Sequence, residues 1–163
     1  EQELAKIAGC MHDIGNAINR KNHAEYGALL ANDILKEMGA ATEDRMTIIA
    51  AIGNHDESTG GAKDPVSAAL ILADKSDVRQ NRVRTQDREK FDIHDRVNYS
   101  VKEAELKINE ERTVIRLKLS VDTRYGSVMD YFEIFMGRML LCRKAAEALG
   151  LQFKLMINEQ QLI

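Results

Sequence analysis

The chain has 163 residues, of which 44% are hydrophobic and 30% charged, with 23 Lys and Arg against 26 Asp and Glu for a formal net charge of −3. This composition excludes a disordered chain, and the length fits one domain, alone or with a small appendage. The mild acidity argues against a dedicated nucleic-acid binder, and no apolar run approaches the roughly 18–20 residues of a membrane span. The only cysteines, Cys10 and Cys142, are isolated thiols. We therefore expect a cytoplasmic protein without a cysteine-based zinc site.

The first half of the chain predicts four short helices. Apolar residues at helical spacing predict the first helix over residues 2–12. Asn22, followed three residues later by Glu25, predicts a capping box at the start of the second. Thr42 is a good N-cap for the third helix. Asp64-Pro65 is a strong start signal for the fourth, because Pro is favoured at the first helical position.

The pattern changes after about residue 99. Apolar and polar residues alternate over residues 104–108 and 115–121, which predicts two half-buried strands joined by a turn at residues 109–112. Helical spacing returns over residues 127–149, and residues 151–157 alternate again. We predict an α+β protein, in which an all-α bundle is followed by a small β-β-α-β segment with an antiparallel sheet packed on one helix.

These patterns suggest one domain over residues 1–99 and an appendage over residues 100–163. A small sheet leaves exposed edges, which proteins usually pair or cover. We therefore expect residues 100–163 to act in dimerisation or regulation, or to pack tightly against the helical domain. Because Glu1 already lies in a predicted helix and the first Met is Met11, we expect the natural N-terminus upstream.

Histidines and aspartates gather at the ends of the predicted helices. The candidates are His12, Asp13, His23, His55 and Asp74. A single His at a helix end is more often a cap or a surface residue, and Asp56 is most simply solvated. Asp74, however, ends an apolar helix and needs a partner. Imidazole and carboxylate groups converging from several helices would form a site for a divalent metal ion.

Basic residues follow this group, from Arg79 to Lys90. The simplest interpretation is a solvated helix face or a linker. The functional alternative is that Lys75 and Arg79, close in sequence to Asp74, contact a substrate phosphate. The sequence has no glycine-rich phosphate loop and no nucleophile elbow.

Four segments carry a resemblance to a known family. They are Cys10-Met-His-Asp-Ile-Gly-Asn16, His23-Ala-Glu-Tyr-Gly-Ala28, Gly53-Asn-His-Asp-Glu57 and Ala73-Asp-Lys75. Over roughly residues 1–80 the chain resembles the HD-domain superfamily of metal-dependent phosphohydrolases. The resemblance implies an HD-type helical bundle in which His12, Asp13 and Asp74 bind one metal ion. It also implies that His23 and His55 hold a second ion or face the phosphate. A further family His would fall before Glu1, and Asn16 stands where many relatives have Lys.

We therefore expect a metal-dependent phosphohydrolase, a phosphomonoesterase or phosphodiesterase, acting on a small phosphorylated substrate and most plausibly a nucleotide. The expected cofactor is one or two divalent ions of Mn, Fe, Co, Ni, Zn or Mg, which would activate a water molecule. Asp13, His23, His55 and Lys75 are the candidate catalytic residues, and Asp13 could bridge two ions. Two alternatives remain: a non-catalytic module that binds metal or nucleotide, and an HD-type di-iron oxygenase.

Overall fold

The computed structural model describes residues 1–83 and 91–162. Its chain forms two compact units, which interleave along the sequence. The first consists of Glu1–Asp74 and Lys144–Leu149, and the second of Lys75–Arg143 and Gly150–Ile163. The domain boundary expected at residue 99 stays a prediction. Much of the basic segment from Arg79 to Lys90 lies outside the described residues.

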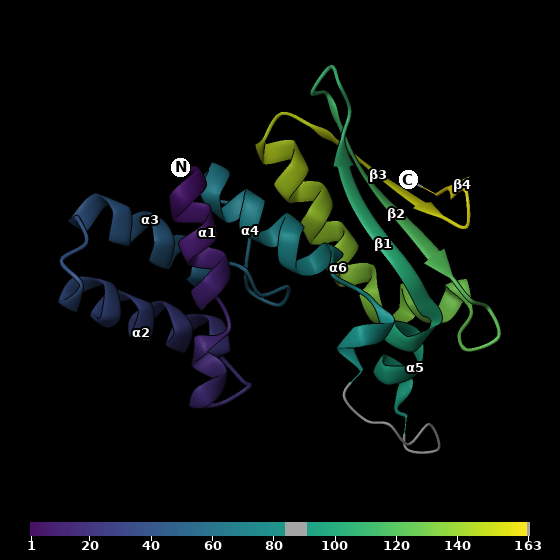
Figure 1. Ribbon diagram of the computed structural model, residues 1–163, viewed down its shortest axis with the longest axis horizontal. Helices are drawn as coiled ribbons and strands as arrows, with labels where there is room; N and C mark the ends of the chain where they lie inside the picture. The colour runs from purple at the N-terminus through teal and green to yellow at the C-terminus, as the bar shows by residue number, and fades with distance from the viewer. Residues whose placement is uncertain (84–90, 163) are drawn as a thin grey trace. The chain divides into compact units, whose positions relative to one another are not determined.

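The first unit is helical, and its four predicted helices are confirmed. They are α1 (Gln2–Met11), α2 (His23–Glu37), α3 (Thr42–Gly53) and α4 (Pro65–Ser76), with the 3₁₀ helix η1 (Ile14–Ala17) between α1 and α2. Helices α2 and α3 lie side by side (Figure 1). The last residues of α4 belong to the second unit.

The helix starts bear out one of the capping predictions. The backbone N–H of Ser67 donates to Oδ1 of Asp64 at 2.8 Å, so Asp64 caps α4 as predicted. Asn22 does precede α2, but its side chain makes no capping hydrogen bond, and the predicted capping box is wrong. The reason is the backbone of Asn22, which is left-handed at φ 60° and ψ 27°. Asn tolerates this conformation, which differs from the extended backbone of an ordinary N-cap.

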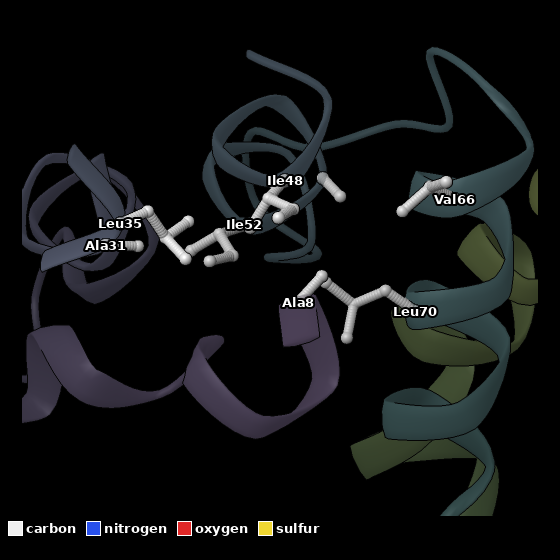
Figure 2. Packing of buried hydrophobic residues seen from close by; sticks show 8 residues of the cluster. Ala8, Ala31, Leu35, Ile48, Ile52, Val66 and Leu70 are labelled. Atoms are coloured by element: carbon white, nitrogen blue, oxygen red, sulfur yellow. The ribbon is translucent and has the colours of Figure 1, made fainter. Parts of the chain in front are cut away.

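Buried aliphatic side chains from all four helices form the core of this unit. They are Ala8, Ala31, Leu35, Ile48, Ala51, Ile52, Val66 and Leu70. Figure 2 shows Leu70 pointing toward Ala8, and Ile52 lying between Leu35 and Ile48. The small side chains Ala8, Ala31 and Ala51 are fully buried, which lets the helices approach closely. The core thus ties α1 and α4 to the α2–α3 pair, and these elements carry the predicted site residues.

Two glycines allow η1 to cross α2 in close contact. A Cβ atom on Gly15 would overlap the backbone carbonyl of His23 and the backbone N of Gly27. A Cβ atom on Gly27 would lie 3.1 Å from the carbonyl oxygen of His12. The backbone that follows His12 therefore runs directly against the first turns of α2. This contact places His12, Asp13 and His23 in one region.

The second unit contains a four-stranded sheet. Its strands are β1 (Val101–Ile108), β2 (Val114–Val121), β3 (Gln152–Ile157) and β4 (Gln160–Gln161), in the spatial order β1-β2-β3-β4 (Figure 1). The helices are α5 (Ile93–Ser100), the short η2 (Gln80–Arg82) and most of α6 (Val128–Ala148). The three predicted strands and the long helix are confirmed, whereas α5 and β4 were not predicted.

The sheet is mixed, and the expectation of a purely antiparallel sheet is wrong. Strands β1 and β2 pair antiparallel, as do β3 and β4, but β2 and β3 pair parallel. The physical reason is the connection between β2 and β3. Parallel neighbours need a crossover of about a dozen residues or more, usually helical, and α6 supplies it. The chain therefore returns along α6 to the end of the sheet where β2 began.

Strand alternation gives the sheet one buried face. On β2 the side chains of Ile115, Leu117, Leu119 and Val121 are buried, and the intervening residues are exposed. Helix α6 carries a buried stripe of Tyr131, Phe135, Met139 and Cys142.

Among the helices of the described residues, none combines the length and apolarity that a bilayer crossing requires.

We predict that Gly15→Ala lowers the free energy of unfolding by about 1–3 kcal/mol, because the added methyl group overlaps backbone that cannot rotate away. Gly9→Ala is the matched control. Gly9 lies within α1 with no atom near its would-be Cβ, so this change should leave stability unchanged or raise it by up to about 1 kcal/mol. Urea unfolding of both variants measures the difference. Equal stabilities would contradict the close crossing.

Candidate metal centre

The structure brings together all five side chains named as candidate metal ligands. His12 follows the last residue of α1, His23 begins α2, His55 follows α3 and Asp74 lies in α4. The Nε2 atom of His12 lies 3.5 Å from Oδ2 of Asp13 and 3.6 Å from Oδ1 of Asp74. The distal carboxylate and the His-Asp doublet are therefore neighbours in space, although about 60 positions separate them in the sequence.

Asp13 also faces the two other histidines. Its Oδ1 lies 3.5 Å from Nε2 of His23 and 4.0 Å from Nε2 of His55. The two Nε2 atoms of His23 and His55 are 3.2 Å apart. The rings of His12 and His23 both meet His55 edge to face, at centroid distances of 5.1 and 5.0 Å. His55 therefore lies between the other two histidines.

Each of the three histidines is held by the same local hydrogen bond. The Nδ1 atoms of His12, His23 and His55 lie 2.8, 3.1 and 2.6 Å from the carbonyl oxygens of Gly9, Arg20 and Ile52. In each case the carbonyl belongs to the residue three positions earlier. Since a carbonyl oxygen only accepts, each Nδ1 must carry the proton and donate. In a neutral ring, Nε2 is then left with its lone pair.

This arrangement brings atoms that carry lone pairs or negative charge close to one another. The lone pairs of His23 and His55 face each other at 3.2 Å, with an Oδ atom of Asp13 beside them. Lone pairs and carboxylate oxygens repel at such distances unless a cation lies among them. A proton on one ring or a metal ion satisfies this need, and the Nδ1–carbonyl bonds resemble the contacts that orient metal-binding histidines.

The exposed fraction of the side chains differs from one residue of the cluster to the next. His55 is fully buried and His23 is 5% exposed, whereas the side chain of Asp13 is 46% exposed. His23 and His55 are therefore shielded from water, and Asp13 stands at the open edge of the cluster.

The donor atoms fit a divalent ion. Two overlapping groups, His12–His55–Asp74 and Asp13–His23–His55, each have ligand atoms within 4.8 Å of one another. Imidazole nitrogen together with carboxylate oxygen favours Mn, Fe, Co, Ni or Zn, since Mg²⁺ prefers oxygen ligands alone. The residues present therefore suit a transition metal. His55 belongs to both groups but has one free nitrogen, so a second ion would depend on Asp13 and His23.

Lys75 and Arg79 are the candidate phosphate contacts, and neither belongs to the two ligand groups. Arg79 pairs with Asp77 at 2.7 Å. Lys75 follows Asp74 in α4, its side chain is 5% exposed, and it belongs to the second unit. Its contact with a substrate phosphate stays a prediction.

Asp56 is a residue near the cluster that the sequence analysis assigned to solvent. Its side chain is 23% exposed, and its Oδ2 lies 3.8 Å from Nδ1 of His23. The signal that could have found it is its position directly after His55, which repeats the order of the His12-Asp13 doublet.

Comparison with protein families agrees with the geometry. The model of the HD domain matches residues 1–97, which include all five clustered side chains. The chain therefore belongs to the HD-domain superfamily of metal-dependent phosphohydrolases. No curated protein and no solved structure matched the chain.

The electrostatics of the metal-free cluster centre on His12. Its pKa is raised above the usual value, chiefly because its ring forms a hydrogen bond with the carboxylate of Asp74. Burial of the ring opposes this, and the Gly9 carbonyl and the charges of Asp74 and Asp13 add to the increase. Without a metal ion, the carboxylates of Asp74 and Asp13 thus favour the protonated form of His12.

We predict that the metal-free protein loses stability as the pH rises. A raised folded-state pKa means that the His12–Asp74 pair contributes fully below the unfolded pKa of about 6.5, and this contribution disappears as the pH rises through the folded pKa. The free energy of unfolding in EDTA, measured across this range, should fall more steeply than in His12→Asn. His94→Asn is the control, because His94 is exposed on α5. Parallel pH profiles for the wild type and His12→Asn would contradict the pairing.

Proposed function

We propose that the protein is a metal-dependent phosphohydrolase that hydrolyses a small phosphate ester at the cluster of His12, Asp13, His23, His55 and Asp74. One observation carries the proposal: three Nε2 atoms and two carboxylates converge, and each ring is fixed by a hydrogen bond from its other nitrogen. Membership of the HD superfamily supports the same reaction class.

The cofactor in this proposal is a divalent transition-metal ion, with one or two per site. When bound, such an ion polarises the phosphoryl oxygen and lowers the pKa of water toward about 7. The chain then needs no nucleophile of its own. Because His55 has one free nitrogen, Nε2, it could bind only one of two ions. His12 and Asp74 would hold one ion and His23 the other, and Asp13 could reach both ions through its two oxygens.

The exposed position of Asp13 defines its role in the proposal. It stands at the open edge of the cluster and reaches the histidines on both sides, His12 through Oδ2, and His23 and His55 through Oδ1. A carboxylate with its two oxygens turned to different partners suits a ligand shared between two ions. His23 and His55, behind it, exclude water from the inner side.

A nucleotide or a related small phosphate ester is the proposed substrate. A non-catalytic metal-binding module would show the same cluster, so bound metal alone does not decide between the two. Metal analysis of the purified protein, followed by a phosphatase screen with Mn²⁺, Co²⁺, Ni²⁺ or Fe²⁺, tests the proposal. Stoichiometric metal without hydrolysis of any monoester or diester would favour the binding module.

We predict that Asp13→Ala binds metal at least about a hundredfold more weakly and hydrolyses no phosphate ester. Changes in residues that only orient ligands cost 10–100-fold, so loss of a ligand should cost at least as much. The variant should stay folded, because the Asp13 side chain is 46% exposed and outside the apolar core. His94→Ala, which removes an exposed histidine of α5, should retain metal and activity. Metal content, circular dichroism and turnover are the measurements, and an active Asp13→Ala variant would refute the assignment.

We predict that His23→Ala retains one metal ion but turns over more slowly. His23 belongs to only one of the two ligand groups, so the group of His12, His55 and Asp74 remains complete. Metal-to-protein ratios from plasma emission, compared with kcat, test this. A ratio and a rate equal to those of the wild type would leave His23 with a structural role alone.

A further inference from the structure

A pocket of about 230 Å³ lies beside the histidine cluster, at the start of α2 and the loop that follows α3. Its lining includes Arg20, Lys21, Glu25, Asp56, Ser58 and Thr59. All of these residues belong to the helical unit. Asp56 also borders the cluster, with Oδ2 at 3.8 Å from Nδ1 of His23. Asp56 therefore borders both the pocket and the Nδ1 side of the His23 ring.

The lining offers both donors and acceptors. Arg20 and Lys21 supply N–H donors, and the carboxylates of Glu25 and Asp56 supply acceptors. The hydroxyl groups beside them both donate and accept. Two positive and two negative side chains cancel in formal charge, so the pocket does not select a bare anion. None of the described residues that line it is aromatic, and none is aliphatic.

The acceptor side of the pocket is fixed in place. Oδ1 of Asp56 accepts a hydrogen bond from the backbone N–H of Ser58 at 2.9 Å and another from the Ser58 hydroxyl. The loop thus holds the Asp56 carboxylate between His23 and the pocket. Glu25 lies in the first turn of α2, two residues after His23. The same short segment of α2 therefore contributes to both the cluster and the pocket.

We propose that this pocket binds the sugar part of a phosphorylated sugar, whose phosphoryl group is the one hydrolysed at the histidine cluster. The inference rests on the proposed function. Sugar hydroxyls each donate and accept, and hydrogen bonds to charged groups are the stronger ones, so the lining matches them. The volume is below the roughly 300–1,000 Å³ of pockets for drug-sized ligands. One sugar ring fits, and a purine or pyrimidine finds no ring to stack on.

The test compares three substrates and a matched pair of variants. Ribose 5-phosphate presents a sugar, adenosine 5′-monophosphate a sugar with a base, and p-nitrophenyl phosphate no sugar. Glu25→Gln removes the acceptor charge in the pocket, whereas Glu37→Gln makes the same change on the exposed last residue of α2. We expect Glu25→Gln to raise KM for ribose 5-phosphate about tenfold with little change in kcat, and to leave p-nitrophenyl phosphate unaffected. Glu37→Gln should change neither KM.

A second pair guards against a folding defect in Glu25→Gln. Lys21→Met removes a donor from the pocket, and Lys36→Met removes an exposed lysine near the end of α2. Only the former should raise KM for ribose 5-phosphate. The proposal is overturned if neither Glu25→Gln nor Lys21→Met changes this KM. It is also overturned if these variants raise KM equally for ribose 5-phosphate and for p-nitrophenyl phosphate.

A binding measurement separates this inference from the proposed function. In the phosphonate analogue of ribose 5-phosphate, a methylene group replaces the ester oxygen, so hydrolysis is blocked. Calorimetry on the metal-loaded protein should show about tenfold weaker binding to Glu25→Gln than to the wild type, and no such difference for methylphosphonate. Binding of this kind without hydrolysis of any ester would support the pocket and refute the hydrolase. If Glu25→Gln hydrolyses ribose 5-phosphate with the same KM as the wild type and binds the phosphonate equally well, the pocket is refuted and the hydrolase is not.

The KM for adenosine 5′-monophosphate shows whether the bound sugar belongs to a nucleotide or to a free sugar phosphate. If KM for adenosine 5′-monophosphate also rises in Glu25→Gln, the ribose of a nucleotide enters the pocket with its base outside, and the proposal holds for nucleotides. If only ribose 5-phosphate responds, the proposal holds for free sugar phosphates. A nucleotide that is hydrolysed independently of Glu25, with ribose 5-phosphate neither bound nor hydrolysed, overturns it.

Discussion

The close crossing of η1 over the start of α2 is the constraint on which the candidate centre depends. Gly15 lies against the carbonyl group of His23, and Gly27 lies against that of His12, so no side chain separates the two backbones. Asp13 comes directly before η1, and His23 is the first residue of α2. Because both ends of this connection are held in contact, Asp13 reaches His12 on one side and His23 on the other. The apolar core then brings α3 and α4, with His55 and Asp74, to the same place.

Within this frame, the rings are oriented before any ligand arrives. Each Nδ1–H donates to a carbonyl oxygen of the preceding turn, so no ring needs to rotate when Nε2 takes up a metal ion. The energetic cost of this orientation is electrostatic, since lone pairs and carboxylates face one another around His55. Protonation of His12 relieves part of it. A metal ion and a proton compete for Nε2 of His12, so metal affinity and pH are linked in this cluster.

Much of the fold and of the cluster could be predicted, because both depend on short-range patterns. Helical spacing predicted α1 to α4, and dispersed His and Asp residues at helix ends predicted the cluster. The direction of β3 could not be predicted in this way, since alternation reports which face is buried and says nothing about parallel pairing. The capping box predicted at Asn22 fails because of a backbone angle, and the position of Asp56 depends on how one loop turns. Dimerisation through residues 100–163 and a cytoplasmic location stay predictions.

The interleaving of the two units bears on how the chain folds as it is synthesised. Domains usually fold in order as they leave the ribosome. Here the last piece of the helical unit is Lys144–Leu149, which follows β1 and β2 of the other unit. Every ligand of the candidate centre is therefore synthesised before the last piece of its own unit. During that interval, metal ions in the surrounding solution can meet an unfinished site, and early capture of one would help the helices to assemble.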